Sequence, residues 1–191
     1  MVLDCGQVIP MKHFVALPLV LLGISGFIAL QSLTVAAAPG PHAASVAIDG
    51  TIDNVSARYL SRAFKVAGRD GARFLIVSLD TPGGLFDSTR EMVEDIRGSD
   101  IPVIVYVSPP GARAASAGTF ITAAAHVAAM APTTNIGAAS PVGGGGEDLP
   151  ETLKSKATQD AAAFIRSIAQ ERRRNAEALE QTVLSAKAYS A

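Results

Sequence analysis

Cysteine and charge are both scarce in this chain. One cysteine, Cys5, occurs in 191 residues. That excludes an internal disulfide and a metal site made of several thiolates, and the position of Cys5 near the N-terminus argues against a cysteine nucleophile. Charged residues make up 17% of the chain, the net charge is −1, and no basic stripe stands out, which argues against nucleic-acid binding. Any chemistry must therefore come from other side chains.

The scarcity of charge is concentrated near the N-terminus. Residues 14–35 (FVALPLVLLGISGFIALQSLTV) carry no charge, Lys12 precedes them, and small residues follow. A basic start, an apolar stretch and a small-residue end form a secretory signal, and the apolar run is also long enough to remain as a single membrane anchor. We expect residues 1–38 to be one or the other. Because Lys12 should stay in the cytoplasm, the remaining residues should lie on the outer side of the membrane.

Residues 39–191 are expected to form one α/β domain without a second core. Three apolar runs predict strands, of which the last two are typical of strands buried on both faces: 45–50, 74–79 and 101–107. Helical patterns lie between them, the first capped by Asp53 or Asn54 and the second at 87–96. The order strand, helix, strand, helix, strand predicts βαβ units and a parallel sheet.

Helical spacing and turn residues organise the other segments. Apolar residues recur at helical spacing in the first helix: Val55, Tyr59, Ala63 and Val66. Later elements are expected to be a helix at 116–126, a strand at 127–130, a glycine loop at 143–146, a helix at 153–174 and another helix from Ala176 onward. The run Arg172–Arg174 is interpreted as solvated or helix-end charge.

Two loops of this predicted sheet are candidate sites, because ligands of open parallel sheets bind beyond the carboxyl ends of the strands. The turn DTPGG (80–84) follows one strand, and its paired glycines can present bare N–H groups, although alone it is equally consistent with a plain turn. The segment PPGARAASAG (109–118) follows the next strand. It places Ser116 near a helix N-terminus, where the dipole favours a developing oxyanion, although a small residue or cap in an alanine-rich helix explains it as well.

A nucleophilic serine needs a base, and the histidines are poorly placed to supply one. Two of the three lie in the N-terminal segment and the linker after it, and His126 lies about 15 Å beyond Ser116 along a helix. We interpret His126 as structural. A lysine base requires a pKa lowered from about 10.4 to near 7–8, as in Ser-Lys variants of the catalytic triad. Lys154 and Lys156 both begin the long helix, and their spacing does not choose between them.

Three stretches, taken together, resemble a known family: LDTPGG (79–84), IPVIVYVSPPGARAASAGTFI with AAHVAAMAPTTNIGAASPV (101–142), and FIRSIAQERRRN (164–175). They are similar to the N-terminal domain of the long NfeD proteins, which are membrane-bound serine proteases associated with stomatin operons and have the ClpP/crotonase fold. The resemblance extends from Val46 to about Leu184. It implies a ClpP/crotonase-like α/β fold for this chain.

The resemblance also implies a Ser-Lys dyad. The family's serine lies in the motif ASAG and matches Ser116. Its lysine opens the long helix, and an ungapped match to the FIRSIAQ stretch places it at Lys156, with Lys154 in reserve. The implied oxyanion hole consists of backbone N–H groups: those of Gly83, Gly84 and Ala117.

The activity implied is that of a membrane-associated serine endopeptidase without metal or cofactor. It would cleave hydrophobic peptide segments, such as those of stomatin-like partners, and form dimers or larger assemblies, with the 143–146 loop as a mobile flap. The family's chain continues into transmembrane helices and a β-barrel, so a sequence that ends at Ala191 is expected to be a fragment or a truncated reading frame. Two alternatives remain: a non-catalytic scaffold that binds peptides or stomatin-like partners, and a crotonase-type acyl-CoA enzyme, against which export argues.

Overall fold

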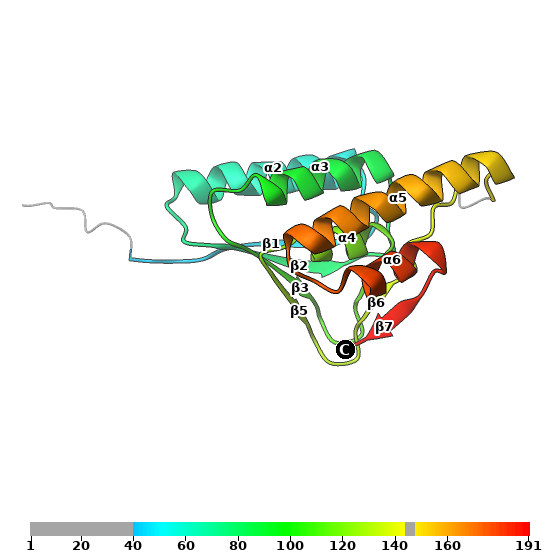
Figure 1. Cartoon of the computed structure of the whole chain (residues 1–191). Coiled ribbons are helices and arrows are strands. Elements are labelled where there is room, and N and C mark those ends of the chain that lie inside the picture. The colour runs from blue at the N-terminus through cyan, green and yellow to red at the C-terminus, as the bar shows by residue number, and fades with distance from the viewer. Residues whose placement is uncertain (1–39, 144–147) are drawn as a thin grey trace, which may run out of the picture. The chain divides into compact units, whose positions relative to one another are not determined.

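The computed structural model describes residues 40–143 and 148–191. The predicted signal or anchor segment and most of the glycine loop lie outside these ranges. Residues 41–191 form one compact unit (Figure 1). Within the described part of the chain, no helix combines the length and the apolar character needed to cross a membrane.

A four-stranded parallel sheet forms the centre of the domain, in the order β1-β2-β3-β5. Its strands are β1 (Ala44–Asp49), β2 (Leu75–Asp80), β3 (Val103–Val107) and β5 (Val127–Met130). Helices α2 (Asn54–Arg69) and α3 (Phe86–Arg97) connect the first three strands. The prediction of βαβ units and a parallel sheet is therefore confirmed.

The helices cover one face of this sheet and leave the other partly open (Figure 1). On β2, Leu75, Val77 and Leu79 are fully buried, whereas Ile76 and Ser78 between them are only partly buried. On β3, Tyr106 is 37% exposed. The prediction that these strands are buried on both faces is therefore wrong, because an apolar run does not reveal that a face lacks a covering layer.

A second sheet of three short strands was not predicted. It has the order β4-β6-β7 and consists of β4 (Arg113–Ala115), β6 (Asn135–Gly137) and β7 (Ala188–Ser190). Strand β6 pairs in parallel with β4 and antiparallel with β7. Three residues are too few for an alternating pattern to appear in the sequence.

The remaining helices are α4 (Ala117–Ala124), α5 (Glu151–Glu171) and α6 (Ala176–Leu184). Every residue of α4 is buried. Its Phe120 ring lies 5.7 Å from Phe86 of α3 and 5.8 Å from Phe164 of α5, measured between ring centroids. This aromatic cluster fixes α4 between the two outer helices. Helix α5 ends three residues before the predicted Arg174, because Arg173 has a positive φ of 53°.

Helix α2 begins as predicted but presents a different face to the core. The Asp53 carboxylate accepts the N–H groups of Val55 and Ser56, both at 2.9 Å, and these bonds lower its pKa, with the N–H of Ser56 as the largest cause. Val55 and Tyr59, which marked the helix in the sequence, are 75% and 52% exposed. The buried side chains of α2 are Ala57, Leu60 and Ala67.

Candidate active site

Ser116 occupies a sharp turn between β4 and α4. Its backbone has φ 49° and ψ −111°, a conformation that residues with a side chain rarely adopt. Two hydrogen bonds of 2.9 Å hold it: the Ser116 N–H donates to the Gly137 carbonyl, and the Thr119 N–H donates to the Ser116 carbonyl. Strained strand-to-helix turns of this kind expose the nucleophile of serine hydrolases.

Gly137 is itself fixed on both sides. Its N–H donates to the buried Thr119 hydroxyl at 3.1 Å, and that hydroxyl donates to the Ala114 carbonyl at 3.0 Å. Gly137 has φ 130°, and a Cβ there would lie 2.2 Å from the Lys187 carbonyl oxygen, so the position requires glycine. The small sheet thus supports the backbone of Ser116.

The Pro-Gly-Gly turn after β2 lies directly against Ser116. A Cβ on Gly83 would lie 2.6 Å from the Ser116 Cβ, and a Cβ on Gly84 would lie 2.0 Å from the Ile52 carbonyl oxygen. Ile52 donates its N–H to the Gly83 carbonyl and accepts the Leu85 N–H, both at 2.8 Å. Because these bonds flank Gly84 on the side of Ile52, the N–H of Gly84 points to the opposite side.

Two of the three predicted oxyanion donors have a free N–H beside Ser116. Gly84 and Ala117 line the same cavity as Ser116, and neither N–H donates to an acceptor within residues 40–143 and 148–191. The Gly83 N–H instead donates to the Thr81 hydroxyl at 3.0 Å. The expectation that Gly83 supplies an oxyanion donor is therefore corrected: its role is to leave room for Ser116.

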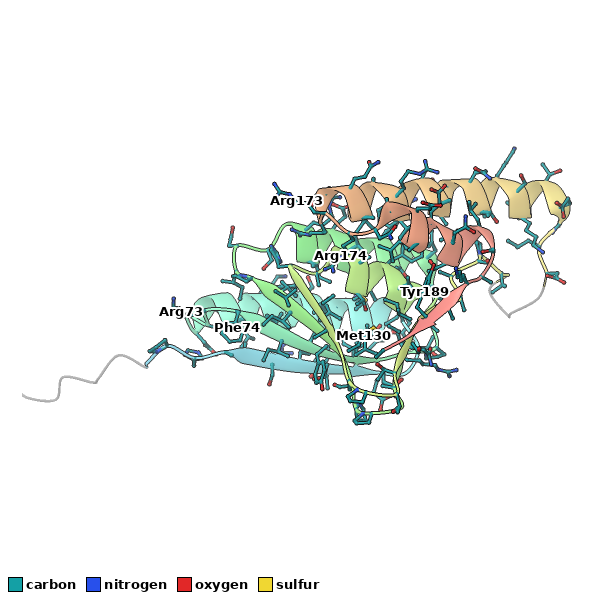
Figure 2. The ribbon with its side chains drawn as sticks, turned by 60° about the horizontal axis from the view of Figure 1, so that its bottom comes forward. Arg73, Phe74, Met130, Arg173, Arg174 and Tyr189 are labelled. Carbon is teal, nitrogen blue, oxygen red and sulfur yellow. The ribbon has the colours of Figure 1, made fainter. Side chains whose placement is uncertain are left out.

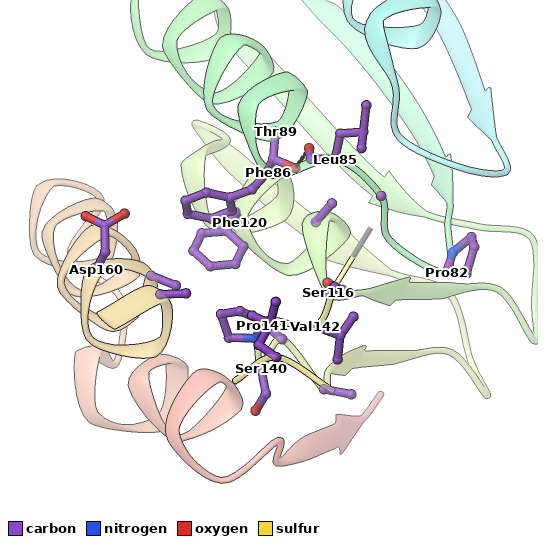
Figure 3. Close-up of a pocket in the computed structure, with 18 of the residues that line it drawn as sticks. Pro82, Leu85, Phe86, Thr89, Ser116, Phe120, Ser140, Pro141, Val142 and Asp160 are labelled. Carbon is purple, nitrogen blue, oxygen red and sulfur yellow. Dashed lines mark hydrogen bonds between the residues drawn. The ribbon is translucent and has the colours of Figure 1, made fainter. Parts of the chain in front are cut away.

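A cavity of about 580 Å³ opens onto Ser116 (Figure 3). Most of its walls are apolar side chains from four segments: Leu85, Phe86, Phe120, Pro141, Val142 and Ala161. One carboxylate, that of Asp160 on α5, also lines it and forms an ion pair of 2.7 Å with Arg90. A cavity of this size and lining suits an apolar peptide segment.

The structure does not bring the predicted lysine to the serine. Lys156 lies on α5 next to Ala157, which lines the cavity, but the Lys156 side chain is exposed and no hydrogen bond joins it to Ser116. Lys154 lies 3.7 Å from the carboxylate of Asp148. The geometry thus assembles Ser116 with two N–H donors and leaves both lysines outside the cavity.

His126 has a structural environment. Its Nδ1 accepts the N–H of Val103 at 3.2 Å, at the end of α4 remote from Ser116. Burial lowers the pKa of His126, and the positive charge of Arg172 lowers it further. The ring therefore favours the neutral form that accepts this bond.

Two arginines of the run after α5 cap another helix. Arg172 Nε donates to the Ala124 carbonyl at 2.7 Å, and Arg174 donates to the carbonyls of Ala123 and Ala125 at 2.8 and 2.7 Å. Burial lowers the pKa of Arg174, and the charge of Arg172 adds to this effect. These are the last carbonyls of α4, which cationic donors stabilise. The sequence carries no signal for this contact, because about fifty residues separate the partners.

No metal site is evident in the described part of the chain: nowhere in it do three His, Cys, Asp or Glu side chains gather as ligands.

A family model described as the NfeD1b N-terminal domain matches residues 43–189. The chain belongs to this family. Among curated proteins, it is similar to the membrane-bound protease PH1510 of Pyrococcus horikoshii, with 43% identity over 138 residues. The match covers 71% of this chain and 31% of that protein, so the chain spans under a third of its relative's length.

Solved structures of NfeD relatives have the same fold. A serine-to-alanine mutant of the 1510-N membrane-bound stomatin-specific protease superposes with a TM-score of 0.73 at 37% identity, covering 80% of this chain and 74% of that chain. A lysine-to-alanine mutant of the same protease, in complex with a substrate peptide, superposes with a TM-score of 0.72 at 37% identity. The match covers 78% of this chain and 69% of that chain. ClpP1 from Listeria monocytogenes shares the fold, with a TM-score of 0.60 at 17% identity. The match covers 76% of this chain and 82% of that chain. The ClpP-like fold of this NfeD1b domain is therefore established.

Proposed function

We propose that this domain is a serine endopeptidase with Ser116 as its nucleophile. One observation carries the proposal: the strained turn of Ser116 opens onto an apolar cavity in which the N–H groups of Gly84 and Ala117 have no other acceptor. Such a pair of donors matches the needs of an acyl-transfer oxyanion. The similarity to a membrane-bound protease supports the same activity.

In the proposed reaction, Ser116 Oγ bonds to the peptide carbonyl carbon while its proton passes to the Lys156 amine. The carbonyl oxygen becomes an oxyanion that accepts the two N–H groups, each donor contributing about 3 kcal/mol. When the C–N bond breaks, the Lys156 ammonium returns the proton to the leaving amine. Water, deprotonated by Lys156, then hydrolyses the acyl-enzyme and restores Ser116.

Lys156 suits the role of base better than Lys154. The Lys154 ammonium forms a 3.7 Å ion pair with the carboxylate of Asp148, whereas Lys156 has no ion-pair partner among the described residues, so its amine is not engaged elsewhere. Because Lys156 adjoins Ala157 of the cavity wall, an apolar substrate in the cavity would exclude water from this part of α5. In this proposal the bound substrate completes the dyad by shielding the Lys156 amine and Ser116 from water.

The proposed substrates are apolar peptide segments, of the kind found in stomatin-like membrane proteins. The apolar cavity walls support this choice, as does the relative that is described as stomatin-specific and was solved with a substrate peptide. We further propose that residues 1–38 deliver or anchor a catalytic unit of residues 39–191 to the outer side of the membrane. The unit would act as a dimer or larger assembly, without a metal or cofactor.

Fluorophosphonate labelling and cleavage of an apolar peptide by the full chain test the proposal. Ser116→Ala should abolish labelling and cleavage, and Lys156→Ala should reduce cleavage on the order of 10⁴-fold while the fold is retained. Lys154→Ala is the matched control two residues away, and His126→Ala is a second control. Both should cleave at rates close to the unmodified chain. Normal cleavage by Lys156→Ala would show that the dyad assignment is wrong.

The exposed position of Lys156 favours a second candidate function, a non-catalytic scaffold that binds apolar peptides in the same cavity. A chain that binds the peptide by fluorescence anisotropy, but neither labels nor cleaves, would support the scaffold. Hydrolysis of an acyl-CoA thioester without peptide cleavage would instead indicate a crotonase-type activity.

A further inference from the structure

Helix α2 concentrates positive charge on one exposed face. It contains four basic residues and no acidic one: Arg58, Arg62, Lys65 and Arg69. Their spacing of four, three and four residues places them within about 60° of one another around the helix axis. All four are exposed, and none forms an ion pair with a residue that the structure describes.

The rest of the domain has the opposite balance. Outside α2, residues 39–191 carry eleven basic and sixteen acidic residues, a net charge of −5 against +4 on the helix. The expectation that the chain has no basic stripe is therefore wrong. The stripe becomes visible only when the phase of the helix is known, because the four residues are dispersed along the sequence.

Exposed apolar side chains border the stripe. Val55 and Tyr59 lie one turn apart, are 75% and 52% exposed, and adjoin the basic sector on one side. The opposite side of α2 packs on the core through Leu60 and Ala67. A helix that presents Lys and Arg next to exposed aromatic and aliphatic groups has the pattern of helices that lie in a membrane interface.

The C-terminal end of α2 lies where the chain enters the domain. The Arg73 N–H donates to the His42 carbonyl at 2.9 Å, and the Ala44 N–H donates to the Phe74 carbonyl at 3.1 Å. Figure 2 shows Arg73 and Phe74 at this end of the sheet. Six residues lie between the apolar run 14–35 and His42, so the seven steps from Val35 to His42 reach at most about 25 Å. A bilayer that holds this run therefore has its headgroups within reach of the end of α2.

We propose that α2 docks on the surface of an anionic lipid bilayer. Its basic stripe lies against phosphate groups, while Val55 and Tyr59 enter the interface. The N-terminal end of α2 adjoins the active-site cavity, since Asn54 accepts the Ser88 hydroxyl at 2.8 Å and Thr51 and Leu85 line the cavity. Docking thus brings the edge of the cavity to the membrane surface. The proposal does not depend on the chemistry of Ser116.

Tryptophan fluorescence tests the docking, because the chain contains no tryptophan. The full chain carrying Tyr59→Trp is reconstituted in vesicles of phosphatidylcholine alone or with phosphatidylglycerol, each with brominated acyl chains as quenchers. We expect a blue shift and quenching only with phosphatidylglycerol, lost in about 1 M salt, where the Debye length falls to about 3 Å. Tyr106→Trp, on the open face of the sheet, is the matched reporter and should not be quenched.

Neutralising the stripe should release the helix. The triple substitution Arg58→Gln, Arg62→Gln, Lys65→Gln should weaken docking about 100-fold, or about fivefold per basic residue. The control removes three exposed basic residues elsewhere: Arg113→Gln, Arg173→Gln and Lys187→Gln. It should dock like the parent, and far-UV circular dichroism verifies folding.

Three results would overturn the proposal: equal quenching in both lipids, quenching unaffected by the triple substitution, or a blue shift that depends on protein concentration and not on lipid. The last result would show that a second copy of the chain covers this face.

Discussion

The two halves of the proposed dyad are built in different ways. Ser116 has a backbone held by two hydrogen bonds, and the glycines of the neighbouring turn leave no space for a single extra carbon. Lys156 on α5 is exposed and forms no hydrogen bond or ion pair with the described residues around Ser116. The fold alone therefore brings together Ser116 and the N–H groups of Gly84 and Ala117, the proposed nucleophile and oxyanion donors. It does not bring Lys156, the proposed base, to them, and we propose that the substrate does so.

The largest effect is expected from Gly84→Ala, which disrupts the glycine turn packed against Ser116. Its Cβ would lie 2.0 Å from the backbone oxygen of Ile52, which cannot move without displacing the turn. We expect a loss of more than about 4 kcal/mol in the free energy of unfolding, measured in urea, together with loss of fluorophosphonate labelling. Gly68→Ala on α2 is the control, because beyond its chain neighbours and the backbone of its own helix no atom lies within 4 Å of the added carbon. A Gly84→Ala chain as stable as the parent would show that the turn is not rigid.

Removing the cap at the far end of α4 should have the next largest effect. Arg174→Ala leaves two carbonyls of a buried helix end without their charged donor. The expected loss is about 2–4 kcal/mol in thermal or urea unfolding. The neighbouring Arg173→Ala should change stability by less than about 0.5 kcal/mol, because Arg173 is exposed. Similar losses from both substitutions would contradict the capping role.

Relieving the strain at Ser116 should raise stability while abolishing activity. Glycine adopts the positive φ of this position without a steric cost, so Ser116→Gly should stabilise the fold by about 1 kcal/mol. Ser116→Ala retains the strain and should unfold at about the same urea concentration as the parent. If the two variants are equally stable, the backbone of Ser116 stores no strain.

Substitutions on α5, the helix that carries Lys156, should have little effect on stability. Asp160→Asn breaks the ion pair with Arg90. Because the Asp160 and Arg90 side chains are 65% and 38% exposed, the substitution should lower the free energy of unfolding by less than about 1 kcal/mol. A double-mutant cycle with Arg90→Gln isolates the pair. A coupling above about 2 kcal/mol would show that α5 is held to α3 as firmly as Ser116 is held to its neighbours.

The smallest effect concerns pH and His126. Its pKa in the folded chain lies below the ordinary 6.5, so the unfolded chain binds more protons as the pH falls. The contribution of His126 to stability is therefore fully present above about pH 6.5 and declines as the pH falls below it. Urea midpoints between pH 7 and pH 5 should show this decline, and His126→Gln should flatten it. An identical slope in both chains would exclude His126 as its source.

Periodicity and turn residues were sufficient to predict the parallel sheet, a cap at Asp53 or Asn54, of which Asp53 is the one observed, and the position of Ser116 at the start of α4. These features depend on local pattern. The other features of the site depend on contacts between residues far apart in the sequence, which local sequence patterns do not reveal. Whether Gly83 or Gly84 has a free N–H is decided by Thr81 and Ile52, and the basic stripe of α2 appears only when its buried face is known.

The hydrogen bond from Ser116 to Gly137 has a consequence for biosynthesis. Gly137 belongs to β6, which pairs with β7, and the Ala138 N–H next to it donates to the Lys187 carbonyl at 3.0 Å. The ribosome adds these partners some seventy residues after the serine. The backbone of Ser116, the proposed nucleophile, is therefore fully supported only after residues 187–190 have been translated. A nascent chain that lacks these residues also lacks part of the support for Ser116.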